Sequence, residues 1–150
     1  MNIAVASDHA GYALKEQIKD YLQENGYSYF DFGAFSEAPV DYPDIAWQAA
    51  RAVQKGECEK GIIICGTGIG VCIAANKLRG VRAALCADTY SAGCSREHND
   101  ANILTLGARV TGVGLALEIV RVFLERPFAG GRHAARLEKI KEIELHQIKN

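Results

Sequence analysis

The sequence predicts a single α/β domain: a Rossmann-like three-layer fold with a five-stranded parallel sheet and an extra C-terminal helix. Three observations indicate this fold. Segments typical of strands alternate with segments of helical periodicity along the chain. The β-branched run at residues 62–64 is typical of a strand buried on both faces, as in a parallel sheet. The length of 150 residues, of which 49% are apolar, suits one domain, residues 1–150, with a substantial core.

The first half of the chain contains two strand–helix pairs. We expect a strand at residues 2–6 and then a helix whose apolar residues recur at helical spacing up to Leu22. The pair Asn25-Gly26 is a typical helix end. Residues 27–32 form an aromatic-rich second strand, expected near an edge of the sheet. A loop then leads into a helix that runs to about residue 55, with Pro43 in its first turn.

The second half continues the alternation with three more strands. Strands are expected at 61–65, 81–86 and 102–106, and helices at 70–78, 89–97 and 111–125. Thr111 is the expected cap of the last of these helices. Beyond Pro127 and Gly130-Gly131, an amphipathic helix spans about 132–149. This helix is predicted either to fold back on its own sheet or to pack on a second subunit.

A glycine-rich turn, C-G-T-G-I-G, begins at Cys65 after the third strand. Gly66, Gly68 and Gly70 allow the backbone to approach a ligand closely, and the N–H groups that start the next helix attract an anion such as a phosphate or an oxyanion. The same field favours the thiolate form of Cys65. G-x-G-x-G is one residue short of a dinucleotide-binding fingerprint, and Asp88 lies where the ribose-binding acid would be, so a nucleotide-binding protein is an alternative.

Further polar residues follow the first two strands. Asp8 and His9 follow the first strand, and Asp41 and Tyr42 follow the second. The carboxyl ends of parallel strands lie at one edge of the sheet, where α/β proteins bind their ligands. We therefore expect these residues to lie beside the glycine-rich turn, although each acid could also serve only as a helix cap.

Basic and proton-carrying groups come later in the chain. Arg132 and Arg136 lie on one face of a helix and could bind one anion together, although two solvated arginines are the simpler explanation. Arg109 adds a cation after the fifth strand. His98 and Asn99 belong to a polar segment. Imidazole is the natural proton carrier near neutral pH, whereas an isolated histidine is more often structural.

Composition excludes several classes of protein. A formal net charge of −1 argues against a nucleic-acid partner. The lack of a long apolar run and of a signal-peptide-like start predicts a cytoplasmic protein with no membrane partner. The 5 cysteines show no C-x-x-C spacing and are expected to be reduced. No spacing of histidines or carboxylates predicts a metal site, so we expect none.

Seven motifs, in unbroken order, resemble those of the type B ribose-5-phosphate isomerases, a family that also includes allose-6-phosphate and galactose-6-phosphate isomerases. They are S-D-H-A-G at 7–11, D-Y-P at 41–43, C-G-T-G-I-G at 65–70, A-A-N-K at 74–77, H-N-D-A-N at 98–102, G-A-R at 107–109 and G-G-R-H-x-x-R at 130–136. The resemblance implies an isomerase of the pentose phosphate pathway that interconverts D-ribose 5-phosphate and D-ribulose 5-phosphate through an enediolate, without metal or cofactor. It also implies a homodimer, or a dimer of dimers, with the active site between subunits.

The resemblance further implies roles for individual residues. Cys65 matches the base that takes the C2 proton and returns it at C1, and Thr67, in the same loop, could pass a proton between O1 and O2. His98, assisted by Asp8, matches the acid that opens the sugar ring. The remaining matches bind the phosphate (His9, Arg109, Arg132 and Arg136), the sugar hydroxyls (Tyr42 and Asn99) and the reacting end of the sugar (Gly66, Thr67, Gly68, Ile69 and Gly70). Asp88 matches no catalytic role and is expected to cap a helix.

Two other functions stay open at this point. A six-carbon sugar-phosphate isomerase could use the same residues, because the loops around Tyr42 and Asn99 could set the depth of the pocket. A nucleotide-binding module without chemistry is the more distant alternative. It leaves Cys65, His98 and the arginine pair unexplained.

Overall fold

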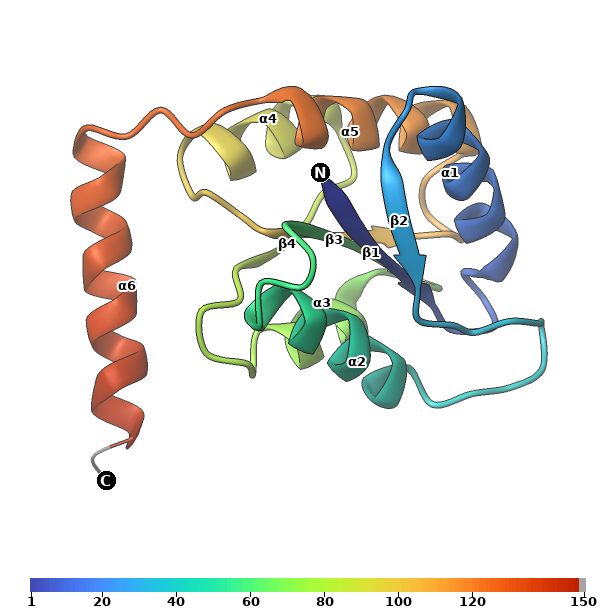
Figure 1. The fold of residues 1–150 in the computed structure, drawn as a ribbon, viewed down its shortest axis with the longest axis horizontal. Helices are drawn as coiled ribbons and strands as arrows, with labels where there is room; N and C mark the ends of the chain where they lie inside the picture. Colours follow the sequence, from blue (N-terminus) through green and yellow to red (C-terminus); the bar gives the residue numbers. More distant parts are fainter. Residues whose placement is uncertain (149–150) are drawn as a thin grey trace.

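The structure is a computed structural model that describes residues 1–148, and strands alternate with helices along the chain (Figure 1). The elements in order are β1 (Asn2–Ser7), α1 (Tyr12–Glu24), β2 (Ser28–Asp31), α2 (Tyr42–Gln54), β3 (Lys60–Cys65), α3 (Ile69–Ala75), β4 (Ala83–Leu85), α4 (Thr89–Glu97), β5 (Ile103–Gly107), α5 (Val113–Glu125) and α6 (Arg132–Ile148). No helix within residues 1–148 combines the length and the apolar character needed to span a bilayer.

The five strands form one sheet in the order β2-β1-β3-β5-β4, and all neighbouring pairs are parallel. The predicted α/β fold class is thereby confirmed, as is the edge position of the second strand. The central strand, β3, is buried along its whole length between β1 and β5. Its continuous apolar run reflects this burial, because helices cover both faces of a parallel sheet.

Two apolar cores fill the space between the sheet and its helices. α2 and α3 cover one face, and α1, α4 and α5 cover the other (Figure 1). Successive side chains of β3 alternate between the two cores: Ile62 and Ile64 face α1 and α5, whereas Ile63 and Cys65 face α2 and α3. Cys65 is therefore held by core packing at the end of a strand that is buried along its whole length.

Most predicted helix ends are confirmed, and one is wrong. Asn25 is the C-cap of α1 and is followed by a left-handed Gly26, and Pro43 lies in the first turn of α2. The carboxylate of Asp88 caps α4 by accepting from the Ser91 backbone N–H at 2.7 Å. Thr111, by contrast, does not cap α5, which starts at Val113. Its backbone N–H donates instead to Gly107 O at 2.9 Å, so Thr111 belongs to the turn that ends β5.

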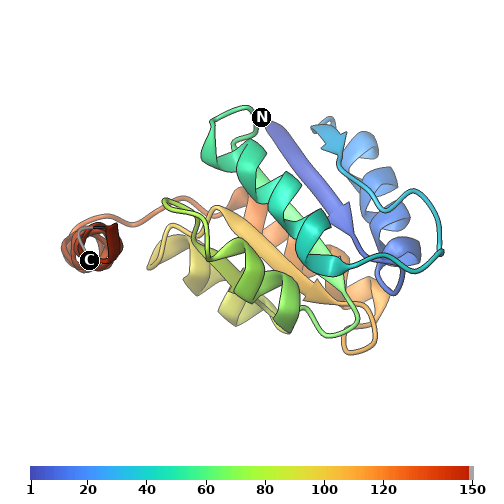
Figure 2. The ribbon, with the colours of Figure 1, turned by 90° about the horizontal axis from the view of Figure 1, so that it is seen from below.

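The last helix, α6, stands away from the sheet and its covering helices (Figures 1 and 2). The link before it contains Gly130 and Gly131, both left-handed with φ of 65° and 55°. Two backbone contacts tie this region to the body: Ala129 N–H donates to Glu97 O at 3.0 Å, and Gly80 N–H donates to the Glu144 carboxylate at 3.2 Å. The predicted helix is confirmed through residue 148. Its expected last residue, 149, lies outside the described residues.

Candidate active site

Cys65 is the last residue of β3 and is 5% exposed. Its Sγ accepts a hydrogen bond from the Gly68 backbone N–H at 3.1 Å, within the turn that starts α3. A donor at this position stabilises negative charge on sulfur. Thr67, between these two residues, is exposed, and its Oγ1 accepts from the Ile69 N–H at 3.2 Å. The turn thus presents a hydroxyl and a thiol side by side at the carboxyl edge of the sheet.

Close backbone packing fixes the shape of this turn. Gly68 adopts a left-handed conformation, with φ of 77°, which favours glycine. At Gly107, a Cβ atom would lie 2.6 Å from the backbone of Thr67, so the end of β5 accommodates the turn only without a side chain. Backbone hydrogen bonds from Ala108 N–H to Cys65 O and from Arg109 N–H to Gly66 O complete the attachment, at 2.9 and 3.0 Å.

Asp8 and His9 lie beside this turn, at the end of β1. Asp8 is 8% exposed, its N–H donates to Ile64 O at 3.1 Å, and its Oδ1 accepts from the Gly11 N–H at 3.0 Å. His9 Nδ1 accepts a hydrogen bond from the Val40 N–H at 3.3 Å. In a neutral imidazole this leaves the proton on Nε2, which is then free to donate to a ligand.

Tyr42 and Arg109 border the glycine-rich turn from two other elements. Tyr42 begins α2, and its ring lies so close to the start of α3 that a Cβ on Gly70 would be 2.6 Å from it. The Arg109 guanidinium lies over Gly66, with Nη1 3.3 Å from a Cβ placed there. Arg109 is exposed and forms no ion pair within residues 1–148. The residues predicted to follow β1, β2, β3 and β5 therefore gather at one edge of the sheet.

The remaining predicted residues form a second cluster. His98 ends α4, Asn99 follows it exposed, and the His98 ring stacks on His133 of α6 with centroids 4.3 Å apart. Arg132 and Arg136 extend from the same first turns of α6 and are exposed. His133 was assigned no role from the sequence, because only the folded structure brings it to His98. Desolvation and the positive charges of its neighbours lower the pKa of His133.

The two clusters lie at opposite ends of the strands. The first cluster lies at the carboxyl ends, and the His98 cluster lies at the amino ends. Gly61 pairs with Ile103 where β3 and β5 start, and Cys65 pairs with Gly107 where they end. Parallel strands rise about 3.3 Å per residue, so these two ends of the strands are roughly 13 Å apart. The His98 segment leads directly into the start of β5, and the strand arrows point away from α6 (Figure 2). One chain therefore does not bring His98, Asn99 and the arginine pair to Cys65.

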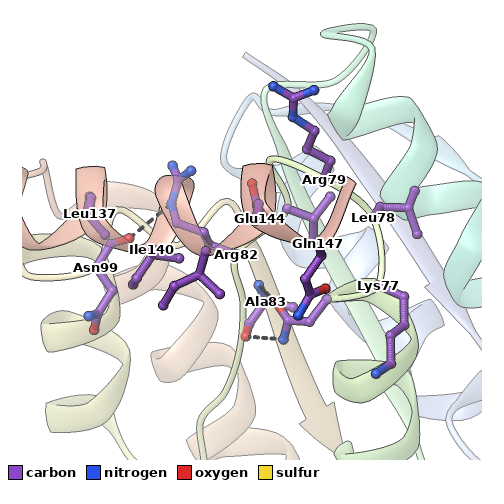
Figure 3. Close-up of a pocket in the computed structure, with 13 residues that line it drawn as sticks. Lys77, Leu78, Arg79, Arg82, Ala83, Asn99, Leu137, Ile140, Glu144 and Gln147 are labelled. Atoms are coloured by element: carbon purple, nitrogen blue, oxygen red, sulfur yellow. Dashed lines mark hydrogen bonds between the residues drawn. The ribbon is translucent and has the colours of Figure 1, made fainter. Parts of the chain in front are cut away.

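A hollow of ≈ 660 Å³ lies beneath α6, on the side of the second cluster (Figure 3). Residues of α6, among them Leu137 and Ile140, line one wall. Asn99 and the segment after α3, which includes Lys77, Leu78 and Arg82, line the rest. The hollow does not include Cys65. It separates α6 from the body of its own chain.

Three further observations concern possible metal ligands, the cysteines and Asp88. Within residues 1–148, no group of three or more His, Cys, Asp or Glu side chains is placed to hold a metal ion. All 5 cysteines are free thiols. Both oxygens of the Asp88 carboxylate serve the helix cap, since they accept hydrogen bonds from Ser91 at 2.7 and 2.8 Å.

The fold and the site define an α/β protein with a thiol, a hydroxyl and backbone N–H groups at the ligand-binding edge of a parallel sheet. Residues 3–140 match the model of the ribose/galactose isomerase family, so the match covers nearly the whole chain. The chain belongs to this family and is a sugar-phosphate aldose–ketose isomerase.

Individual relatives agree along their full lengths. Ribose-5-phosphate isomerase B of Escherichia coli is 49% identical, with 95% of each chain covered. D-erythrulose-4-phosphate isomerase of Pectobacterium atrosepticum is 46% identical, covering 100% of this chain and 99% of the relative. The structure of Clostridium thermocellum ribose-5-phosphate isomerase B matches with a TM-score of 0.97 at 55% identity, covering 98% of this chain and 99% of that one. Mycoplasma genitalium ribose-5-phosphate isomerase B with bound ribulose-5-phosphate matches with a TM-score of 0.92 at 43% identity, with 95% of each chain covered.

Proposed function

We propose that this protein interconverts D-ribose 5-phosphate and D-ribulose 5-phosphate through an enediolate intermediate. The single observation that carries the proposal is the Cys65 sulfur, which lies 3.1 Å from the Gly68 N–H beside the exposed hydroxyl of Thr67. This arrangement supplies a base together with donors for the oxygens that become negative during enolisation. The similarity to the Mycoplasma genitalium enzyme with bound ribulose-5-phosphate supports the five-carbon substrate.

Groups of the protein alone can carry out every proton transfer of the proposed isomerisation. The Cys65 thiolate takes the proton from C2 of the open-chain aldose, and the electrons of the broken C–H bond form the C1–C2 double bond. Thr67 passes a proton from O2 to O1. The Cys65 thiol then returns its proton to C1 while the carbonyl forms at C2. No electron leaves the sugar, so neither a redox cofactor nor a metal is required by this step.

Residues of both the Cys65 cluster and the His98 cluster take part in ring opening and phosphate binding. In this proposal His98 protonates the ring oxygen, and Arg132 and Arg136 bind the phosphate together with His9 and Arg109. A five-carbon sugar phosphate is too short to bridge the two ends of the strands of one sheet, which lie roughly 13 Å apart. The active site is therefore composite: one chain contributes the Cys65 edge, and a second copy contributes the His98 cluster.

Exposed apolar side chains support such a dimer. Ile140, Ile143 and Leu145 of α6 are 44%, 60% and 38% exposed, although a helix face of this kind is normally covered. Near the Cys65 edge, large apolar side chains are also exposed on α3, β4 and α4: Ile69, Ile73, Leu85 and Tyr90. Both regions would be buried if the α6 end of one copy contacted the Cys65 edge of the other.

The first test is Cys65→Ala. We expect the variant to keep the fold and to lose nearly all turnover of ribose 5-phosphate, because it lacks the base assigned to the C2 proton. The matched control is Cys72→Ala, which removes a partly buried thiol in the middle of α3 and should keep most of the activity. The assay is run with a chelator. Undiminished turnover by Cys65→Ala would refute the assigned base.

The second test concerns the substrate. Because one relative is a D-erythrulose-4-phosphate isomerase, we compare kcat/KM for ribose 5-phosphate and erythrulose 4-phosphate. Allose 6-phosphate and galactose 6-phosphate represent the six-carbon alternative. The proposal expects the highest kcat/KM for ribose 5-phosphate; a clear preference for any other substrate would replace it.

A further inference from the structure

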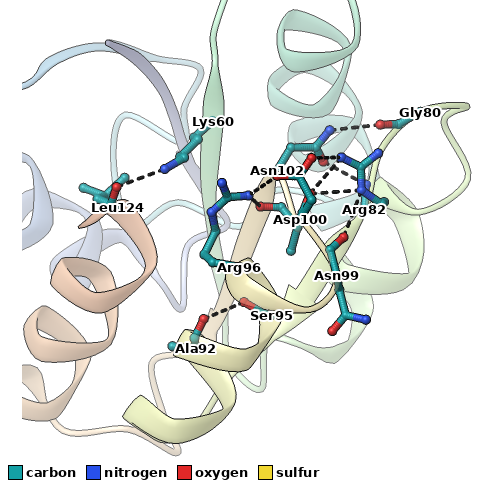
Figure 4. Close-up of polar contacts among 11 residues, drawn as sticks. Lys60, Gly80, Arg82, Ala92, Ser95, Arg96, Asn99, Asp100, Asn102 and Leu124 are labelled. Carbon is teal, nitrogen blue, oxygen red and sulfur yellow. Dashed lines mark hydrogen bonds and ion pairs between the residues drawn. The ribbon is translucent and has the colours of Figure 1, made fainter. Parts of the chain in front are cut away.

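We propose that Arg82, Asp100 and Arg96 form a positioning unit that holds His98 where it can act on the sugar ring. The inference rests on the proposed function, in which His98 opens the ring. None of the three residues is assigned to catalysis or to substrate binding above. Together they bind the turn that directly follows His98 (Figure 4).

Asp100 is the centre of the unit. Its backbone is left-handed, with φ of 43°, and it is the only residue other than glycine with a positive φ within residues 1–148. Such a conformation persists when the surroundings hold it in place. The carboxylate joins two guanidinium groups: Oδ1 accepts from Arg96 Nη1 at 2.8 Å, and Oδ2 accepts from Arg82 Nη2 at 3.0 Å.

The same two arginines also bind the backbone of the turn. Arg82 Nε donates to Asn99 O at 3.1 Å and to Asp100 O at 3.0 Å. Arg96 Nη1 donates to Ala101 O at 2.7 Å. Three consecutive carbonyls after His98 thus accept hydrogen bonds from charged donors, which are stronger than neutral ones.

Neighbouring contacts keep both arginines in place. Arg96 is 8% exposed and lies over the Phe123 ring at 5.8 Å. The segment that carries Arg82 is fixed by Asn102, whose Oδ1 accepts from the Arg82 N–H at 2.8 Å and whose Nδ2 donates to Gly80 O at 2.9 Å. The unit is therefore anchored to the core through Arg96 and to the loop before β4 through Arg82.

His98 lies at the C-terminal end of a helix. It is the residue that follows α4, where its N–H donates to Cys94 O at 2.8 Å, and helix ends fray when nothing holds them. The stacked ring of His133 restrains one face of the imidazole. The turn beyond His98 supplies the second restraint. A proton donor must come within hydrogen-bond reach of the ring oxygen, and a displacement of 1 Å costs about 100-fold in rate.

The test separates ring opening from proton transfer at carbon. Ribose 5-phosphate is a closed furanose and needs its ring opened. Ribulose 5-phosphate has no ring, because the oxygen that would close it carries the phosphate. Exchange of its C1 hydrogen with solvent deuterium requires Cys65 but not His98: the C1–H bond breaks, the proton passes to sulfur, and a deuteron from D₂O returns.

The variants are Asp100→Asn and Asp100→Gly, with Arg121→Met as the matched control. Asparagine and glycine both tolerate the left-handed conformation, so the backbone can persist while the carboxylate bridge is lost. Arg121 also bridges two carboxylates, those of Glu118 and Glu125, on α5. We expect kcat/KM for ribose 5-phosphate to fall by about 100-fold in the Asp100 variants. Deuterium exchange into ribulose 5-phosphate should stay near the wild-type rate, and the control should keep both reactions.

The outcomes are distinct. If both Asp100 variants lost isomerisation and exchange equally, in proportion to their loss of thermal stability, the unit would have only a structural role. That result would overturn this inference and leave the proposed function standing. Unchanged isomerisation would overturn it as well. A wild-type protein that catalyses neither reaction overturns the proposed function and, with it, this inference.

Discussion

Lys60 is a buried lysine at the start of the central strand. It is 9% exposed, its Nζ donates to Leu124 O at 3.0 Å, and it lies 5.8 Å from the Phe123 ring. Burial lowers the pKa of Lys60 to about 8, and the positive charge of Arg96 acts in the same direction. At neutral pH the folded protein therefore carries a lysine whose charged form it disfavours.

This predicts how stability changes at alkaline pH. In the unfolded chain Lys60 has the ordinary pKa of about 10.4, so between pH 8 and that value the unfolded state binds more protons and stability rises with pH. Compared with Lys60→Met, the wild type should gain about 2 kcal/mol between pH 7.0 and 9.5. Urea unfolding of both proteins at the two pH values measures this gain. A difference that stays constant with pH would contradict it.

At the residue scale, the sequence was sufficient to predict features whose contacts lie within a few residues of one another. Cys65 and its turn could be predicted because the glycines, the strand and the helix start are contiguous in the chain. The same holds for the Asp88 cap, whose partner Ser91 is three residues away. His133 could not be predicted, because its contact with His98 joins distant parts of the chain.

At the scale of elements, the loop between β2 and α2 is tied to the site by a buried charge. Lys15 of α1 is fully buried and donates to Asp31 Oδ1 at 2.7 Å and to Ala34 O at 2.5 Å. Ala34 N–H in turn donates to Ser7 O, one residue before Asp8. Burial alone would raise the pKa of Asp31, but hydrogen bonds from two lysines lower it.

Replacing Lys15 by methionine should therefore destabilise the protein strongly. Asp31 would lose its buried partner, and the Ala34 carbonyl would lose its donor, which together should lower the free energy of unfolding by about 2 to 4 kcal/mol. The control is Lys19→Met. Lys19 also contacts Asp31, at 2.9 Å, but its side chain is 18% exposed, so we expect a loss of at most about 1 kcal/mol. Equal losses in the two variants would contradict a special role for Lys15.

Helices and strands could be predicted where the spacing of apolar residues is regular. The residues at which they begin and end were harder to predict. The strands and helices were all expected, because buried runs and helical spacing are properties of short segments. Thr111 was wrong as a cap because cap preference competes with tertiary contacts, and here the turn after β5 takes its backbone N–H. The buried Lys15 lies at a helix position that the sequence alone does not distinguish from a surface lysine.

At the scale of the whole molecule, the composite site predicts complementation. A Cys65→Ala chain keeps its His98 cluster, and a His98→Ala chain keeps its Cys65 edge, so a mixed dimer has one intact site. If the two chains associate at random, coexpression should restore about a quarter of wild-type activity, because half of the dimers are mixed and each has one of two sites intact. Isomerase activity of the coexpressed pair, compared with each variant alone, measures this.

A failure of the two variants to complement each other would contradict the composite site. If all catalytic residues acted within one chain, no mixture of the two variants would exceed the sum of the separate proteins. The sequence indicated a site between subunits only through resemblance. The strand order and the placement of His98 at the opposite edge are properties of the folded chain, since they depend on how distant strands pair.

The place of α6 in chain order also matters during synthesis. Both apolar cores are built from residues between Ile3 and Leu124, which leave the ribosome before α6 does. A nascent chain can thus complete its sheet while still lacking the helix that carries Arg132 and Arg136. Under the proposed assembly, pairing and turnover therefore begin only once α6 has been synthesised, after both cores are able to form.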